Sequence, residues 1–378
     1  MTERNFKSFL RHVRNYSTRM AEVKLEDARR FIEEILMTVG APEREAKAHA
    51  DLLLYADAVG HNSHGINRLR NYVNDCKTGA CNPSATPTIL NETEATAWVD
   101  ACHTLGATTG HFCMDLAIEK AKLSGVGWVS AKNCNHNGMC SYWAKKAERQ
   151  GFIGLSFTNT PPALVPTRSK ERALGTNPIA MVAPAANCDK LMVDLATSNV
   201  AMGKIEIFAK NKEPIPTGWA LGPDGNPTTD SEEALKAGLL MPLGGEEINS
   251  GYKGYALAAM VEILCSGLSG SNPSHKVPGW DQTDSQKPMN LGQCYAAIDP
   301  ECFAPGFAER IAEYLETLRN LEPADPERPV VVPGDMAINN LKDAEERGTV
   351  AYPQQEIDAL IELAKEYRIR PLQSVQKR

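Results

Sequence analysis

KNCNHNGMCSYWAKKAERQGFIGLSFTNTPPALVPTRSKERALGTNPIAMVAP, residues 132–184, carries a polar turn, a helical pattern and an apolar run in close succession. The apolar residues Val126–Val129 directly before it predict a strand that ends in the polar turn Asn133–Gly138. Tyr142–Gln150 has the pattern of a helix, and Phe152–Phe157 predicts a second buried strand. Strands interleaved with helices in this way are typical of an α/β fold.

His136 lies in that polar turn, between a predicted strand and a predicted helix. Catalytic groups concentrate in loops held by rigid elements, and a neutral imidazole can take up a proton near pH 7. A loop histidine can equally cap a helix or form a hydrogen bond inside a turn, which is its more common role. Its position alone therefore leaves both roles open.

The composition limits the classes of function. The chain has 378 residues, of which 42% are hydrophobic, as expected for one elaborated globular domain or two domains. A net charge of −7 and a pI near 5.7 give no support for a nucleic-acid partner. No apolar run approaches the roughly 20 residues that a membrane span needs. The ten cysteines form no CxxC pair and are typical of reduced intracellular thiols.

Residues 1–19 differ in kind from the rest of the chain. Glu3 is their single acid, against five basic residues: Arg4, Lys7, Arg11, Arg14 and Arg19. A basic, amphipathic, acid-poor start is typical of a mitochondrial transit peptide. An unstructured basic extension explains the same composition, and a start at Met20 would give a cytoplasmic form. The predicted location is therefore the mitochondrial matrix or the cytoplasm.

Hydrophobic periodicity predicts helices towards both ends of the chain and alternating elements between them. The helices begin at Lys24, Glu43, Asn71, Phe307, Ala337 and Gln354. The middle adds the strands Ala95–Asp100, Lys190–Leu195 and Gly292–Ile298 and the helices Thr108–Ser124, Lys204–Asn211 and Tyr255–Leu268. A break rich in Gly, Pro, Ser and Thr at Gly79–Pro87 marks the first expected domain boundary.

Several familiar motifs are missing from the sequence. No predicted strand leads into G-x-G-x-x-G, so a Rossmann dinucleotide site is not supported. A P-loop and a G-x-S-x-G nucleophile turn are absent as well. What remains is a set of polar loop residues: Ser63, His64, Arg68, His136, Thr158–Thr160, Gly175–Asn177, Asp194 and Lys253.

Together these residues suit a small substrate that carries a carboxylate. Arginine offers a planar fork to a carboxylate, histidine can move a hydroxyl proton, and lysine can meet phosphate charge. Each also has a common structural role. A solvated position explains Arg68 and Lys253 as well, a turn explains Asp194, and Ser63 can cap a helix.

Short motifs from about Leu25 to the C-terminus resemble, in one order, those of the type-2 malate/L-lactate dehydrogenases. The relatives of that family include sulfolactate and ureidoglycolate dehydrogenases and piperideine-carboxylate and diketogulonate reductases. The matching motifs are Ser63–Leu69, Asn135–Gly138, Thr158–Thr160, Leu174–Ala180, Asp194–Ser198, Gly203-Lys204, Gly218–Ala220 and Gly251–Tyr255.

The resemblance implies a mixed α/β fold with a non-Rossmann NAD(P)-binding domain, residues 91–304, and usually a homodimer. A helical domain would combine residues 20–90 and 305–378. By motif position, His136 matches the proton acceptor of the family. The substrate side would contain Ser63, His64, Arg68 and Tyr72, and the cofactor contacts would be Thr160, Asp194, Leu195, Ala196 and Lys253. NAD is the expected cofactor, with NADP left open, and no metal is expected.

Three positions depart from the pattern of the family. Asn62 stands where an acid is common, and Asn137 where an aromatic residue commonly follows the histidine. Met336–Asn339 replaces the basic residues that usually follow the late Pro-Gly-acid turn. The first two departures concern the substrate, and the third concerns the contacts with the cofactor's adenosine.

The expected reaction is the reversible oxidation of a small (S)-2-hydroxy acid, with malate or a similar diacid as the first candidate. Reduction of a cyclic 2-imino acid is an alternative within the same family. A family member that binds a ligand without turnover is another. A zinc-dependent hydrolase or lyase that uses His61, His64 and His136 is a further alternative, although no carboxylate motif accompanies these histidines.

Overall fold

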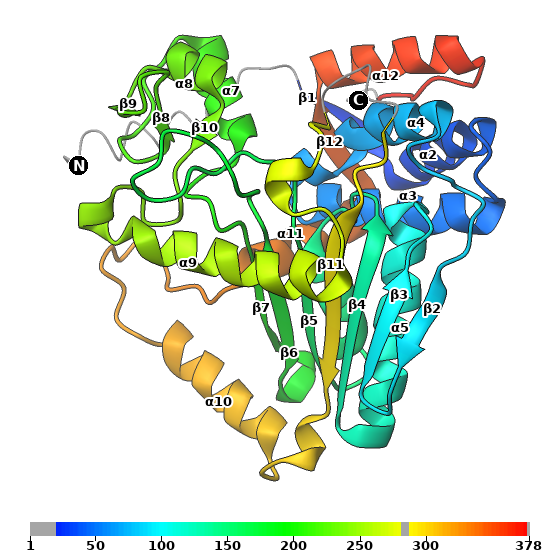
Figure 1. Cartoon of the computed structure of the whole chain (residues 1–378), viewed down its shortest axis with the longest axis vertical. Helices are drawn as coiled ribbons and strands as arrows, with labels where there is room; N and C mark the ends of the chain where they lie inside the picture. Colours follow the sequence, from blue (N-terminus) through cyan, green and yellow to red (C-terminus); the bar gives the residue numbers. More distant parts are fainter. Residues whose placement is uncertain (1–19, 281–286, 376–378) are drawn as a thin grey trace.

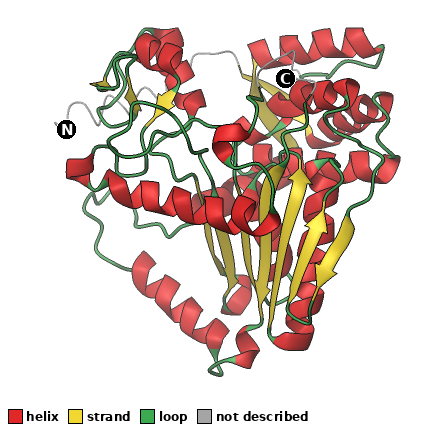
Figure 2. Ribbon diagram, viewed as in Figure 1, coloured by secondary structure: helices red, strands yellow, loops and turns green. Residues whose placement is uncertain are grey.

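The computed structural model describes residues 20–280 and 287–375. The predicted targeting extension, residues 1–19, lies outside these ranges. Figures 1 and 2 show a central twisted sheet with helices on both faces and a group of helices at one end. No helix in the described ranges has the length and apolar character needed to cross a membrane.

The central sheet has seven strands in the order β2-β3-β4-β11-β5-β6-β7. β3 and β4 are parallel, and all other neighbouring pairs are antiparallel. The strands are β2 (Thr88–Glu92), β3 (Thr96–Asp100), β4 (Val126–Cys134), β5 (Ile153–Thr158), β6 (Ile179–Pro184), β7 (Lys190–Leu195) and β11 (Leu291–Ile298). The late strand β11 therefore lies between two strands that are consecutive in the sequence.

Helices bury both faces of this sheet. On one face, α5 (Gly106–Ser124) and α6 (Cys140–Glu148) pack over the core that contains Tyr295. On the other, α9 (Gly251–Glu262) continues into a π-helical turn, η5 (Ile263–Gly267), over the core that contains Cys294. Neighbouring residues of β11 thus point to opposite faces, as strand geometry requires.

The two ends of the described chain share one hydrophobic core. β1 (Met20–Lys24) pairs antiparallel with β12 (Thr349–Pro353), with Val23 opposite Val350. Four helices, two from each end, contribute buried residues to the core around this pair: α2 (Leu25–Thr38), α3 (Glu43–Ala58), α11 (Asp335–Arg347) and α12 (Gln354–Tyr367). α4 (Leu69–Thr78) adds the fully buried Tyr72.

α10 (Phe307–Arg319) packs differently from its neighbours in sequence. Its buried Leu315 contacts Ala185 and Val332 beside β7, outside the core of the terminal helices. The edge strand β2 likewise belongs to the central sheet, although it begins at Thr88. The division into residues 20–90 with 305–378 and residues 91–304 stays a prediction.

A small separate cluster completes the fold. It contains α7 (Met202–Asn211), α8 (Ser231–Ala237) and the strands β8 (Ala220–Leu221), β9 (Pro227–Thr228) and β10 (Leu239–Leu240).

The mixed α/β fold predicted from the sequence is confirmed, and β7 and α12 have the predicted bounds. β1, β2, β6 and β12 were not predicted. Each has five or six residues and gains its backbone hydrogen bonds from another strand, in the case of β1 and β12 from the other end of the chain.

Candidate active site

Two loops bring three histidines into one row. One loop follows α3 and contains the short helical turns η1 (Asn62–His64) and η2 (Ile66–Arg68). The other joins β4 to α6 and contains His136. The ring centroids of His61 and His64 are 4.7 Å apart, and those of His64 and His136 are 5.5 Å apart. The structure thus brings together the two histidines that the sequence singled out.

Buried side chains of β11 and α6 hold the His136 loop. The side-chain oxygen of Asn135 accepts the His136 N–H at 2.7 Å, and Gln293 Nε2 donates to the Asn135 carbonyl at 2.7 Å. Tyr295 OH donates to Gln293 Oε1 at 2.8 Å. Trp143 Nε1 donates to the Asn137 carbonyl at 2.8 Å, so Asn137 is a buried part of this support.

Gly106 allows α5 to approach the same loop. A Cβ atom at this position would lie 1.9 Å from the carbonyl oxygen of His136. Any side chain there would displace the loop, because real Cβ contacts are never so short. The first residue of α5 therefore sets the height of the loop above the sheet.

The His136 ring is neutral at pH 7 and bonded to Tyr72. Burial, together with the nearby charge of Arg68, lowers the pKa of His136 to about 3. Its Nδ1 lies 2.6 Å from the Tyr72 hydroxyl and 3.2 Å from the Gly138 N–H. Tyr72 was predicted to contact substrate, and in the structure its fully buried side chain contacts the histidine.

Trp280 covers His136, which the sequence did not reveal. The two rings are stacked at 4.3 Å with an interplanar angle of 23°. Trp280 Nε1 donates to Asp75 Oδ2 at 3.0 Å, and burial raises the pKa of that carboxyl to about 6. The Arg68 guanidinium carbon lies 5.8 Å from the centre of the same indole ring. A tryptophan in a long polar loop gives no sequence signal for such a contact.

Ser63, His64 and Arg68 form one hydrogen-bonded unit. Ser63 Oγ lies 2.9 Å from His64 Nδ1, and Arg68 Nε donates to the Ser63 carbonyl at 2.6 Å. Within the described ranges the two terminal nitrogens of Arg68 form no hydrogen bond. Burial, together with the neighbouring charges, keeps the pKa of His64 well below its usual value. Arg68 therefore presents the free end of its fork beside two neutral imidazoles.

Asp57 of α3 anchors the loop that carries this unit. Its Oδ2 accepts the Ile66 N–H at 3.0 Å and the Tyr352 hydroxyl at 2.8 Å. A Cβ on Gly65 would lie 1.7 Å from Asp57 Oδ1, so this close approach requires glycine. Burial raises the pKa of Asp57 to about 8.

Of the residues predicted to contact the cofactor, Asp194 lies closest to the histidine row. Its Oδ2 accepts the Ser141 N–H at 2.8 Å at the start of α6, where the helix dipole favours a carboxylate. Its charge also acts on His61. Leu195 and Ala196 follow at the end of β7, with Leu195 exposed and Ala196 half-buried.

Thr160 lies in a different network, centred on Glu262. Thr160 Oγ1 accepts the Thr176 N–H at 2.9 Å, and the Thr160 N–H donates to Asn177 Oδ1 at 3.2 Å. The Glu262 carboxylate then accepts from both loops and from the segment before Trp280. Its donors are Asn159, Asn177, Ser266 and Ser274, at 2.6–3.0 Å. These hydrogen bonds hold the pKa of Glu262 below its ordinary value despite burial, which acts in the opposite direction.

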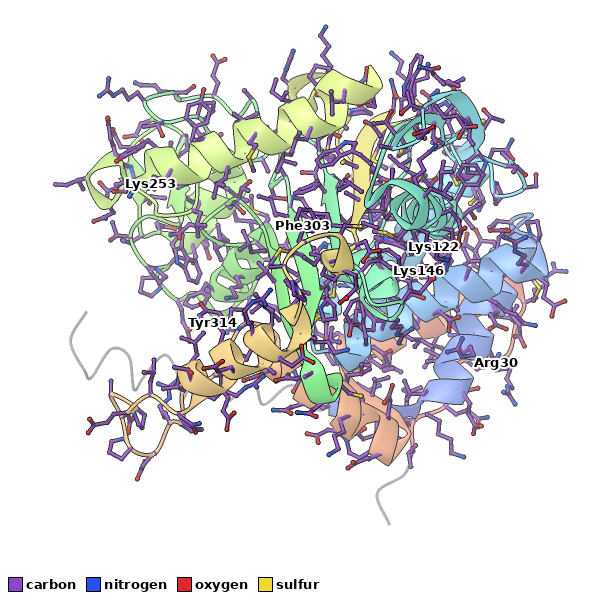
Figure 3. All side chains as sticks on the ribbon, turned by 90° about the horizontal axis from the view of Figure 1, so that it is seen from below. Arg30, Lys122, Lys146, Lys253, Phe303 and Tyr314 are labelled. Atoms are coloured by element: carbon purple, nitrogen blue, oxygen red, sulfur yellow. The ribbon has the colours of Figure 1, made fainter. Side chains whose placement is uncertain are left out.

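Lys253 is apart from these networks. It is exposed on the first turn of α9, and no residue of the described chain forms an ion pair with it. Figure 3 shows it on the opposite side of the view from Lys122 and Lys146.

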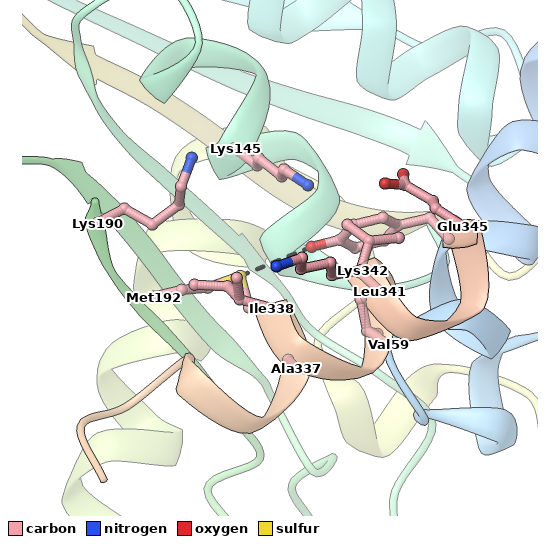
Figure 4. A pocket seen from close by; sticks show the side chains of 10 residues that line it. Val59, Lys145, Lys190, Met192, Ala337, Ile338, Leu341, Lys342 and Glu345 are labelled. Carbon is pink, nitrogen blue, oxygen red and sulfur yellow. Dashed lines mark hydrogen bonds between the residues drawn. The ribbon is translucent and has the colours of Figure 1, made fainter. Parts of the chain in front are cut away.

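A pocket of about 190 Å³ lies next to the histidine row. Its floor is apolar and its walls carry Lys145, Lys190 and Lys342 (Figure 4). Val59 lines it two residues before His61, and Met192 lines it two residues before Asp194. An apolar floor with cationic walls fits the adenosine end of a nicotinamide dinucleotide. No group of three or more His, Cys, Asp and Glu residues in the described ranges is arranged to hold a metal ion.

Comparisons with known proteins identify the family of the chain. The profile of the malate/L-lactate dehydrogenases matches residues 23–361. The chain is 41% identical to a malate dehydrogenase from Pyrococcus horikoshii, over 77% of this chain and 80% of the relative. It is 38% identical to an L-sulfolactate dehydrogenase from Methanocaldococcus jannaschii, over 84% and 90%.

A solved structure has the same fold. Malate dehydrogenase from Entamoeba histolytica superposes with a TM-score of 0.87 at 30% identity, over 93% of this chain and 99% of that one. The resemblance and the class of enzyme predicted from the sequence, a hydroxyacid dehydrogenase, are confirmed by these matches. The chain belongs to the malate/L-lactate dehydrogenase family.

Proposed function

We propose that this chain is an NAD(P)-dependent dehydrogenase of a small (S)-2-hydroxy acid, with malate or a similar diacid as substrate. The single observation that carries the proposal is the free guanidinium fork of Arg68 beside the neutral ring of His136. One group suits a carboxylate, and the other suits the hydroxyl proton on the adjacent carbon.

In the oxidation, Arg68 holds the carboxylate next to the reacting carbon as a charge-assisted pair. His136 takes the hydroxyl proton on Nε2, because Nδ1 is bonded to Tyr72. Ser63 and His64 orient the remaining polar groups of the substrate. The nicotinamide, when bound, supplies the hydride acceptor.

Tyr72 positions the base. In the tautomer with its proton on Nδ1, this nitrogen donates to the Tyr72 hydroxyl, and the Nε2 lone pair is free for the substrate. In the other tautomer Nδ1 accepts from Tyr72 and from the Gly138 N–H, so proton uptake on Nε2 requires the first tautomer. Burial strongly raises the pKa of Tyr72, so its hydroxyl stays protonated and does not itself remove the substrate proton. The stacked Trp280 covers a face of His136 and keeps water from it.

The test is an absorbance assay at 340 nm with residues 20–378 and either NADH or NADPH. Oxaloacetate, pyruvate, other 2-keto acids and a cyclic imine would be offered in turn. Turnover of a 2-keto acid is the expected result. Cofactor binding without turnover of any substrate would favour a ligand-binding protein, and turnover of the imine alone would favour an imine reductase.

We also propose a homodimer. Large apolar side chains are exposed on and beside α9: Ile248, Tyr252, Met260, Ile263 and Leu268. Contiguous exposed apolar side chains of this kind mark association surfaces. Light scattering of the purified chain would give the mass of two copies, and a monomer would contradict the proposal.

A matrix or cytoplasmic location stays a prediction from residues 1–19.

A further inference from the structure

The lysine pocket contains a cation without an ion-pair partner in the described part of the chain. Lys190 Nζ lies 2.6 Å from Glu148 Oε1, and Lys342 Nζ lies 3.9 Å from Glu346 Oε1. Lys145 has no carboxylate partner among the described residues, and its Nζ lies 4.7 Å from the centre of the Tyr55 ring. A partly buried ammonium with neither ion pair nor full hydration is costly.

The surroundings of Lys145 contain charges of both signs. Burial, Arg149 and Lys190 together lower the pKa of Lys145 to about 8, although the charges of Glu148 and Glu345 act in the opposite direction. A bound anion would offset the cost of burial and the repulsion by the two cations. The pocket is therefore electrostatically arranged to receive a negatively charged group.

The order of residues along β7 indicates which part of a ligand that group belongs to. Lys190, Met192 and Asp194 alternate along the strand and share one face of it. Asp194 lies beside the histidine row, Met192 lines the apolar floor, and Lys190 lies roughly 13 Å before Asp194 along the strand. Lys190 thus lies beyond Met192 of the apolar floor, at the far end of β7 from Asp194.

In a nicotinamide dinucleotide the pyrophosphate lies between the nicotinamide and the adenosine. NADP alone carries a further phosphate on the adenosine ribose, and of the phosphates in the molecule it is attached farthest from the nicotinamide. We propose that Lys145, with Lys190 and Lys342, binds this ribose phosphate, so that the chain prefers NADP(H) to NAD(H). The proposal rests on the proposed function, since it assigns one end of the cofactor used there.

Met336–Asn339 lacks the basic residues that are usual in the family, so this segment brings no positive charge to the pocket. Ala337 and Ile338 line the apolar part of the pocket. The positive charge comes instead from α6, β7 and the next turn of α11. Figure 4 shows Lys145 and Lys190 on one wall and Lys342 on the other. Glu345 also lines the pocket, and its charge, with that of Glu148, offsets part of the positive charge at Lys145.

The experiment measures binding by titration calorimetry, without a substrate or turnover. The ligands are adenosine 2′,5′-bisphosphate, 5′-AMP and inorganic phosphate. We expect the bisphosphate to bind at least about tenfold more tightly than 5′-AMP, as one charge-assisted contact provides. Equal affinities of the two nucleotides would overturn the proposal. If inorganic phosphate binds as tightly as the bisphosphate, the pocket is a general anion site, and the proposal is again overturned.

Variants identify the lysine. Lys145→Gln should lower the affinity for the bisphosphate about tenfold or more and leave that for 5′-AMP unchanged. Lys342→Gln, on a different helix, should act in the same direction. Lys122→Gln is the matched control. Lys122 is exposed on α5, so this substitution removes the same charge outside the pocket. Unchanged binding in both pocket variants would contradict the assignment.

The two proposals can fail separately. If the bisphosphate binds but no keto acid is turned over, the proposed reaction is wrong and the assignment of the pocket stands. If NADH and NADPH support turnover equally well and the bisphosphate is not preferred, the proposed reaction stands and the assignment of the pocket is wrong.

Discussion

The two histidine loops are held by different chemistry. The His136 loop is held by neutral groups, the amide of Gln293 and the hydroxyl of Tyr295, which belong to the central sheet. The His64 loop is held by one buried carboxyl, Asp57, which also bonds to Tyr352 of β12. The first support has no charge to change between pH 5 and 8, whereas the second titrates near pH 8.

We infer from this difference that the two loops have different roles. The base needs a fixed position, since misplacement of a catalytic group by about 1 Å can cost roughly 10²-fold in rate. A neutral network inside the sheet provides that position at any pH near 7. The substrate-side loop is coupled instead to the protonation of Asp57 and to the pairing of the two chain ends. Four predictions test whether the loops differ in this way.

The largest expected effect separates the two histidines. His136→Asn should lower kcat by about 10²–10⁴-fold, the usual contribution of a general base. His64→Asn should lower it less, because His64 orients the substrate and does not take its proton. Steady-state kinetics of both variants is the measurement, and cofactor affinity is the control for folding. A loss below about tenfold in His136→Asn would move the base role to His64.

The second prediction breaks the neutral support. Gln293→Leu removes the donor to the Asn135 carbonyl and the acceptor of the Tyr295 hydroxyl, both buried, at about 1–3 kcal/mol each. We expect this loss of unfolding free energy to be the same at pH 5 and pH 8, as measured by urea denaturation. Gln150→Leu, at an exposed position, is the control. A loss that varies with pH would show that the support is not neutral.

The third prediction concerns the carboxyl support. The pKa of Asp57 is about 8 in the fold against its ordinary 3.8, so the folded chain keeps a proton that the unfolded chain releases. Its contribution to stability is therefore full below pH 4 and is lost as the pH rises towards 8, by up to about 1.4 kcal/mol per pH unit.

Asp57→Asn imitates the protonated carboxyl and should remove this slope. Urea denaturation of both chains at pH 5, 6, 7 and 8 measures it, and the exposed Asp343→Asn is the matched control. Parallel curves for the parent chain and Asp57→Asn would show that Asp57 does not titrate in this range.

The smallest expected effect comes from the cover over His136. Trp280→Ala exposes the ring, so the pKa of His136 should rise towards its ordinary value of 6.5. Because the base must be unprotonated, the acid limb of the pH profile of kcat/KM should move to higher pH, by about one unit. Trp98→Ala, a half-exposed tryptophan on β3, serves as control. An unshifted profile would show that the stacked Trp280 does not lower the pKa of His136.

Local sequence signals accounted for much of the fold. The periodicity of Gln354–Tyr367 and the β-branched and apolar run Lys190–Leu195 predicted α12 and β7 with their observed bounds. The same signals missed β1 and β12, because each has five residues and pairs across more than 300 positions. The π-helical end of α9 was missed for a related reason, since Tyr255–Leu268 reads as an uninterrupted helix.

For the site, the sequence indicated which residue types carry the chemistry, but not what holds them. Ser63, His64, Arg68 and His136 were singled out by motif, and the fold places them together. Trp280, Asp75 and Gln293 had no signal, since a lone residue in a loop or strand shows no pattern. The roles assigned to the predicted cofactor residues stay predictions. Thr160 lies in the network of Glu262, and Lys253 is exposed on α9.

The sequence by itself determined most of the long helices and strands, the family and the chemical groups available, because periodicity and motifs are local properties of the chain. The tertiary structure alone decided the protonation state of those groups. His136 is neutral, Asp57 holds its proton to about pH 8, and the pKa of Lys145 is lowered because of what surrounds each of them in space. Burial and nearby charge act over a few ångströms between residues far apart in sequence, so no local pattern records them.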